Sequence, residues 1–83
     1  MTKFNDLVQS ELKRARKMHG PINSIHEGYS VILEELDEVW DEVTKKTSEQ
    51  NLNNLFKELV QVSAMAQKMA EDVVIPKLQA KKK

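Results

Sequence analysis

The chain repeats its apolar residues at the spacing of an α-helix along most of its length, and this pattern leaves few other folds open. Only two glycines and two prolines occur in 83 residues, which is too few for the turns of an all-β domain. Good helix formers, chiefly Glu, Lys, Leu, Gln, Ala and Met, dominate the composition. The sequence therefore predicts an all-α protein.

Local signals mark the ends of the first two helices. The first helix is expected over residues 3–18, because Gly20 follows it as a C-terminal cap and a proline comes next. The second is expected from residue 25 to about 45 or 46. Ser24, just before this helix, and Glu27, in its first turn, form the pattern of a capping box.

The third helix is the longest, and proline marks its expected end. It is predicted over residues 49–74, with Thr47-Ser48 offering an N-cap. Pro76 should break or kink it, because proline lacks the amide hydrogen that a helix interior uses. Residues 77–83 are expected to form either a short extra helical turn or a frayed tail, and the flexible basic tail would be residues 78–83.

The length limits the chain to one domain, residues 1–83. A chain of this size buries only about 60–65% of its extended surface on folding, and the absence of cysteine rules out disulfides. We therefore expect a small antiparallel bundle of three main helices that is completed by homo-oligomerisation, as a dimer or tetramer. Tyr29 and Trp40 lie on one side of the second helix and suit an oligomer interface or the core better than base stacking.

Charge and hydropathy exclude some partners. Thirteen Lys and Arg balance thirteen Asp and Glu, so the net charge does not indicate nucleic-acid binding. No segment approaches the roughly 18 apolar residues needed to span a bilayer. Lys3, Asp6 and Glu11 interrupt any apolar run of a signal peptide. We expect a cytoplasmic protein with neither a membrane nor a nucleic-acid partner.

Residues 33–43 carry six carboxylates within a regular apolar period. Acids this close repel one another, so they either face water or converge on a cation. At 100° per residue, the predicted buried face of this helix is formed by Ile32, Leu36, Val39 and Val43. Glu35 then lies at the edge of that face and Glu38 about 60° further round. Asp37 and Asp41 point into water.

The third helix repeats this arrangement. Its predicted buried face consists of Leu55, Leu59, Val62, Ala66 and Val73. Glu58 and Gln61 then take the angles of Glu35 and Glu38, so antiparallel packing would bring the four side chains together. Oxygen ligands without His or Cys suit a hard cation, Mg²⁺ or Mn²⁺. The alternative is that the two acids at the core margin are neutralised by lysines, the candidates being Lys45, Lys57 and Lys68.

A basic cluster precedes the acidic stretch, and it consists of Lys13, Arg14, Arg16 and Lys17. Lys13, Arg14 and Lys17 are candidates to bind a substrate phosphate if the first helix borders the site. The other interpretation is a solvated face that pairs with acids of the second helix. The residue pattern leaves both open.

The acidic residues resemble a known motif pair. Leu33–Val39, with 19 residues between Glu38 and Glu58, followed by Glu58–Gln61, resembles the Glu-Glu-x-x-Glu and Glu-x-x-Asp motifs of the MazG-like all-α nucleoside triphosphate pyrophosphohydrolases. The resemblance covers about residues 20–74. Gln61 stands where the family usually places Asp.

The resemblance implies a Mg²⁺- or Mn²⁺-dependent hydrolase that converts a nucleoside triphosphate to the monophosphate and pyrophosphate in an oligomeric helical bundle. Carried over by position, Glu35, Glu38 and Glu58 match metal ligands, and Gln61 takes the place of the fourth. Glu35 and Glu38 are the candidates to accept the proton of the attacking water.

The neutral Gln61 removes one negative charge from such a site, which weakens cation binding and water activation. A second hypothesis is therefore a catalytically weak or inactive MazG-like oligomerisation or nucleotide-binding module. A third is a plain structural bundle with a solvated acidic face. It leaves the matching flanks of the two helices unexplained.

Overall fold

The computed structural model describes residues 3–81 and confirms the all-α class, since these residues contain helices and no strand. Residues 82 and 83 of the expected basic tail lie outside this range. The elements, in chain order, are α1 (Phe4–His19), α2 (Ile25–Val43), the 3₁₀ turn η1 (Thr47–Glu49), α3 (Leu52–Met69), the π-helical turn η2 (Ala70–Val74) and α4 (Ile75–Lys81). None of the helices in the described range is long and apolar enough to cross a membrane.

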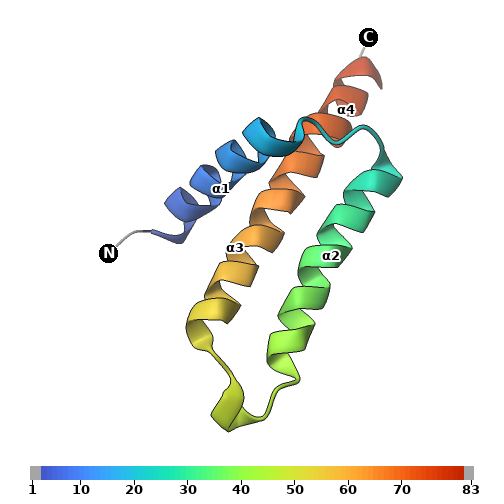
Figure 1. Ribbon diagram of the computed structural model, residues 1–83. Helices are drawn as coiled ribbons and strands as arrows, with labels where there is room; N and C mark the ends of the chain where they lie inside the picture. Colours follow the sequence, from blue (N-terminus) through green and yellow to red (C-terminus); the bar gives the residue numbers. More distant parts are fainter. Residues whose placement is uncertain (1–2, 82–83) are drawn as a thin grey trace.

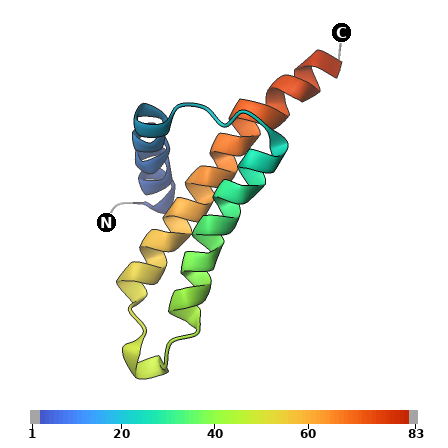
Figure 2. The ribbon, with the colours of Figure 1, turned by 45° about the vertical axis from the view of Figure 1, so that its right-hand side comes forward.

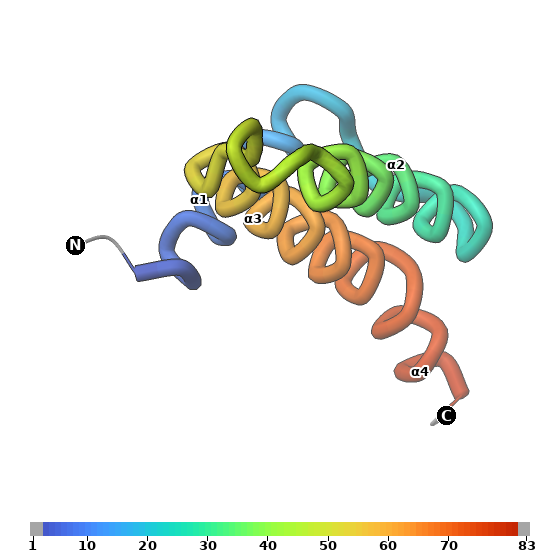
Figure 3. Tube along the Cα trace, turned by 90° about the horizontal axis from the view of Figure 1, so that it is seen from below, coloured from blue at the N-terminus to red at the C-terminus, as the bar shows by residue number. Residues whose placement is uncertain are grey.

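Helix α3 is the centre of the molecule. It runs antiparallel to α2, and the two lie side by side along their length (Figures 1 and 2). Helix α1 packs on α3, and in the described chain it makes no close backbone contact with α2. Within residues 3–81, helix α4 contacts only η2, and it runs away from the other helices (Figure 3). The result is an elongated, open bundle of 54 × 29 × 23 Å.

The hydrophobic core lies mainly between α1 and α3. Its buried residues come from these two helices and are Val8, Leu12, Ala15, Val60, Ala64 and Met65. Helix α2 adds Val31 and Ile32, which are only partly buried. A core of this size fixes α1 firmly on α3 but leaves much of α2 uncovered.

The predicted buried face of α2 is wrong in part. Leu36 and Val43 are 50% and 46% exposed. Ile32 and Val39 turn inward as predicted, and they are joined by Gly28, Val31, Glu35 and Glu42. One cause is a close approach at one point: a Cβ at Gly28 would lie 2.5 Å from Cγ of Met69, so a larger residue would require the Met69 side chain to move.

The predicted face of α3 is also partly wrong. Leu59 is 43% exposed, and Ala66 is exposed as well. The buried residues of α3 are Val60, Ala64, Met65 and Lys68. Because α3 is covered by α1 on one side and α2 on another, its buried face is set by two partners and lies between them.

The first loop matches the sequence signals. Gly20 has φ +70° and its N–H donates to the Arg16 carbonyl at 3.3 Å, which ends α1 as expected. Ser24 Oγ accepts from the Glu27 N–H at 3.0 Å and caps α2. The Glu27 carboxylate accepts from the Asn23 N–H at 3.4 Å, one residue before the position that a full capping box uses.

The second loop differs from the prediction. Helix α2 ends at Val43, and the expected N-cap residues at 47–48 form η1 instead. The true N-cap of α3 is Asn51, whose side chain accepts from the Asn54 N–H. The reason is Glu42, which is buried and accepts from the Asn51 N–H at 2.8 Å and from Lys45 Nζ at 3.1 Å. This side chain joins the end of α2 to the start of α3.

Pro76 does not break the helix. The π-helical turn η2 precedes it, and α4 continues to Lys81. Pro76 is the second residue of α4, where a first-turn position tolerates the missing amide hydrogen. The wider turn changes the hydrogen-bond pattern before the proline, so that the chain continues as a helix.

Candidate metal centre and adjoining pocket

Three of the four sequence-predicted ligands come together. One carboxylate oxygen each from Glu35, Glu38 and Glu58 lies within 4.8 Å of the other two. The i, i+3 spacing places Glu35 and Glu38 on one flank of α2. Antiparallel packing sets Glu58 of α3 opposite them. We call these three residues the carboxylate cluster.

The cluster is electrostatically strained. Burial raises the pKa of Glu35 to about 7, and the neighbouring Glu38 and Glu58 carboxylates act in the same direction. Burial and the same Glu38 carboxylate raise the pKa of Glu58. Neighbouring negative charges disfavour ionisation, whereas a bound cation favours it. The geometry therefore holds acids together at a cost that a divalent cation would remove.

Glu58 supplies a further observation. Its Oε2 atom is buried and has no hydrogen-bond partner among residues 3–81. A buried carboxylate oxygen without a donor is costly and points to a missing partner. An oxygen-only donor set with one such orphaned atom fits a hard cation of the Mg²⁺ or Mn²⁺ type.

Two of the lysines that could neutralise the cluster are engaged elsewhere. Lys45 pairs with Glu42 at 3.1 Å. Lys68 pairs with Asp72 at 3.6 Å and donates to the Gly20 carbonyl. These two pairings weaken the alternative in which lysines cancel the charge of the acids.

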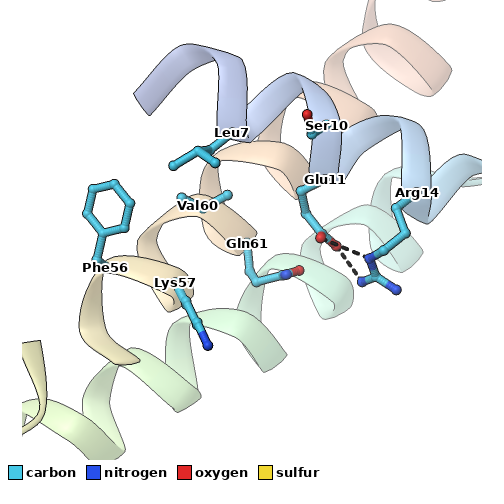
Figure 4. Close-up of a pocket in the computed structure, with 8 residues that line it drawn as sticks. All are labelled: Leu7, Ser10, Glu11, Arg14, Phe56, Lys57, Val60 and Gln61. Atoms are coloured by element: carbon cyan, nitrogen blue, oxygen red, sulfur yellow. Dashed lines mark hydrogen bonds and ion pairs between the residues drawn. The ribbon is translucent and has the colours of Figure 1, made fainter. Parts of the chain in front are cut away.

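Gln61 lies one helical turn after Glu58 and lines a pocket of about 380 Å³ between α1 and α3. This α1–α3 pocket is lined by Leu7, Ser10, Glu11, Arg14, Phe56, Lys57, Val60 and Gln61 (Figure 4). Gln61 of α3 and Glu11 of α1 extend toward each other across it (Figure 4). Gln61, the predicted fourth ligand, is therefore on the same helix as Glu58 and also lines the α1–α3 pocket.

The pocket has an apolar and a charged end. Leu7 and Phe56 lie at one end, and Glu11 and Arg14 at the other (Figure 4). Phe56 is held by an edge-to-face contact with Phe4, with the ring centroids 5.6 Å apart. Such a combination of apolar walls and a few polar groups is typical of small-molecule sites.

Of the predicted phosphate-binding residues, only Arg14 lines the pocket. It binds Glu11 through Nε at 2.9 Å and Nη2 at 2.5 Å. The Glu11 carboxylate raises the pKa of Arg14, and the charge of Glu35 adds a smaller contribution. Lys13 and Lys17 are exposed and are not among the residues that line either described pocket.

Glu35 also borders a second hollow of about 280 Å³. Its lining residues are Ala15, His19, Val31, Glu34, Glu35, Met65 and Lys68. Glu34 therefore faces this second hollow, and it is not one of the three residues of the cluster.

Sequence reasoning did not single out Glu11 or Phe56 as site residues. Both lie on helix faces that look unremarkable in isolation, and the only local signal is Glu11 three positions before Arg14. Their importance depends on how α1 is placed on α3. Arg16, the remaining basic residue of that cluster, binds Asp72 and Glu71 at 2.5 and 2.7 Å and is not part of the pocket.

Comparisons with known proteins add no assignment. No family model, curated protein or solved structure significantly matches the chain.

Proposed function

We propose that the protein is a Mg²⁺- or Mn²⁺-dependent nucleoside triphosphate pyrophosphohydrolase of the MazG-like type, acting in the cytoplasm. The observation that carries this proposal is the convergence of Glu35, Glu38 and Glu58 from two helices, at the positions of the resembling motifs. The orphaned Oε2 of Glu58 supports it, because a cation supplies the partner that this atom lacks.

In this proposal Glu35, Glu38 and Glu58 hold the cation. When bound, it neutralises phosphate charge and lowers the pKa of the attacking water. Glu35 or Glu38 accepts the proton of that water. The attack on the α-phosphorus releases the monophosphate and pyrophosphate.

The α1–α3 pocket is the substrate pocket of this proposal. Arg14 and Lys57 supply positive charge for the phosphates, and Leu7, Phe56 and Val60 supply an apolar surface for the base. The pocket volume of about 380 Å³ is in the range of small-molecule sites. Lys57 precedes Glu58 directly, which links the pocket to the cluster.

A second copy of the chain completes the bundle in this proposal. Helix α2 carries a continuous set of exposed apolar residues, which we call the α2 apolar face: Tyr29, Leu33, Leu36, Trp40 and Val43. Trp40 is 64% exposed and Tyr29 63% exposed. Large apolar surfaces of this kind mark association sites. The face is separate from the inward flank that carries Glu35.

The test is pyrophosphate release from a panel of standard and modified nucleoside triphosphates with Mg²⁺ or Mn²⁺. Glu58→Gln and Glu35→Gln should reduce release on the order of 100-fold or more, because each removes a charge from the cation site. Asp37→Asn is the matched control, since Asp37 is an exposed acid of the same helix. Absence of release by the parent protein from every nucleotide would contradict the enzyme proposal.

The second candidate is a nucleotide-binding or oligomerisation module with little or no turnover. Gln61 favours it, because a neutral amide stands at the fourth position. Gln61→Asp separates the two candidates. An inactive parent that gains pyrophosphate release through this substitution would identify a degenerate site, whereas an active parent supports the enzyme.

A further inference from the structure

The carboxylate cluster lacks one negative charge at the position of Gln61. An amide oxygen can ligate Mg²⁺, but it does not neutralise the cation. If the protein uses a cation at full affinity, another acid close to Gln61 must supply that charge. The described structure offers a small number of candidates.

Glu11 is the acid that faces Gln61. The two side chains extend toward each other from α1 and α3, and both line the α1–α3 pocket (Figure 4). The side chain of Glu11 is only 13% exposed. Its backbone is fixed on α3, because the neighbouring Val8, Leu12 and Ala15 are buried in the core.

Arg14 holds Glu11 in the structure. Its guanidinium donates two hydrogen bonds to the Glu11 carboxylate, at 2.9 and 2.5 Å. The charge of Glu35 also acts on Arg14, although Glu11 is not one of the three residues of the carboxylate cluster. The side chain of Arg14 is 52% exposed and is free to move toward solvent or a ligand.

Two other acids, Asp72 and Glu42, are committed to structural partners. Asp72 accepts from the Ile22 N–H and pairs with Arg16. Glu42 accepts from the Asn51 N–H and pairs with Lys45. Both side chains hold backbone groups together, whereas Glu11 accepts no backbone hydrogen bond in the described structure.

We propose that Glu11 supplies the carboxylate charge that is missing at Gln61, and that Arg14 is the residue which the cation displaces from it. The released Arg14 then binds the triphosphate of the substrate. This inference rests on the proposed function, because it assigns two further residues to the same site. In this proposal, Arg14 neutralises Glu11 until a cation binds. After the cation has bound, Arg14 binds the phosphates of the substrate.

Calorimetric titration with Mn²⁺ and Mg²⁺ alone tests this proposal without any activity measurement. Glu11→Gln should weaken cation affinity on the order of 10-fold or more. Arg14→Gln should strengthen it, because the competing guanidinium is gone. If the Glu11–Arg14 ion pair had a purely structural role, the two substitutions would not change the cation affinity in opposite directions.

The double variant Glu11→Gln/Gln61→Asp should recover the cation affinity lost in Glu11→Gln, because it removes the carboxylate at position 11 and adds one at position 61. Circular dichroism melts of each variant confirm that the fold is retained. If Glu58→Gln abolishes cation binding but Glu11→Gln leaves it unchanged, the assignment of Glu11 is wrong and the proposed function stands. If the parent binds neither cation, the metal-dependent function and this inference both fail.

Discussion

Arg16 donates a hydrogen bond of 2.5 Å to Asp72, which lies 56 positions later in the chain. Asp72 is part of the π-helical turn η2, and it also accepts from the Ile22 N–H at 2.8 Å. Lys68 lies 3.6 Å from the same carboxylate, and its side chain is only 5% exposed. One buried acid therefore ties α1, the first loop and the end of α3 together.

Asp72→Asn should destabilise the protein by about 3–5 kcal/mol, because it leaves the buried Lys68 ammonium without a counter-charge. Urea unfolding at pH 7 measures the effect. Glu71→Gln is the matched control, since the neighbouring Glu71 side chain is 41% exposed and its pair with Arg16 is screened by water. Equal midpoints for the Asp72 and Glu71 variants would contradict the structural role of Asp72.

The cation-free protein should become less stable as the pH rises from about 5 to 8. The pKa of Glu35 is raised from 4.5 to about 7 in the folded state, so the folded protein binds more protons than the unfolded chain between these values. Ionisation of Glu35 therefore lowers the free energy of unfolding. Thermal melts in a chelator across this pH range measure the slope.

Glu35→Gln should flatten that slope and raise the melting temperature at pH 8. The gain is about 1 kcal/mol after allowance for screening at the solvent side of the cluster, or about 4–8 °C for a chain of this size. Added Mg²⁺ should stabilise the parent and not the variant. A parent whose melting temperature rises steadily to pH 8 in chelator would argue against the raised pKa.

Gly28→Ala should destabilise the protein by about 1 kcal/mol, although alanine favours helices. The new Cβ would lie 2.5 Å from Cγ and 2.7 Å from Sδ of Met69, and the strain of overpacking exceeds the gain in helix propensity. In a Met69→Ala background the same substitution should become stabilising. A double-mutant cycle by chemical denaturation measures this coupling, and simple additivity would show that α2 and α3 do not meet here.

Trp40→Lys should weaken self-association, because Trp40 lies in the α2 apolar face and is 64% exposed in the single chain. An aromatic residue at the centre of an interface contributes enough that the dissociation constant should rise on the order of 30-fold or more. Sedimentation equilibrium at micromolar concentration measures it. Asp41→Lys, an exposed position on the same helix, should leave the association unchanged; a monomeric parent would refute the prediction.

Much of the candidate cluster could be predicted from the sequence. The same i, i+3 spacing occurs at Glu35-Glu38 on one helix and at Glu58-Gln61 on the next, and two antiparallel helices bring equal flanks together. This inference needs only the helical period and the short connection between α2 and α3. It holds even though the buried faces were placed incorrectly at Leu36 and Leu59.

The remaining errors share one physical origin. Helix α2 has apolar residues on more than one face, and the sequence does not indicate which face turns toward α3. The contact of Gly28 with Met69 decides it. In the same way, the π-helical turn that carries Asp72 forms where Arg16 and the Ile22 N–H bind it from distant positions.

The sequence by itself determined the three main helices, both ends of the first, the start of the second and the acidic flanks, because these depend on neighbours within a few residues. Only the tertiary structure decided that Glu11 faces Gln61 across a pocket, that Glu58 holds an unpartnered oxygen, and that one apolar face of α2 stays uncovered. Those features depend on the rotation and spacing of whole helices. Helix rotation is set by close contacts between residues far apart in the chain, which no local pattern records.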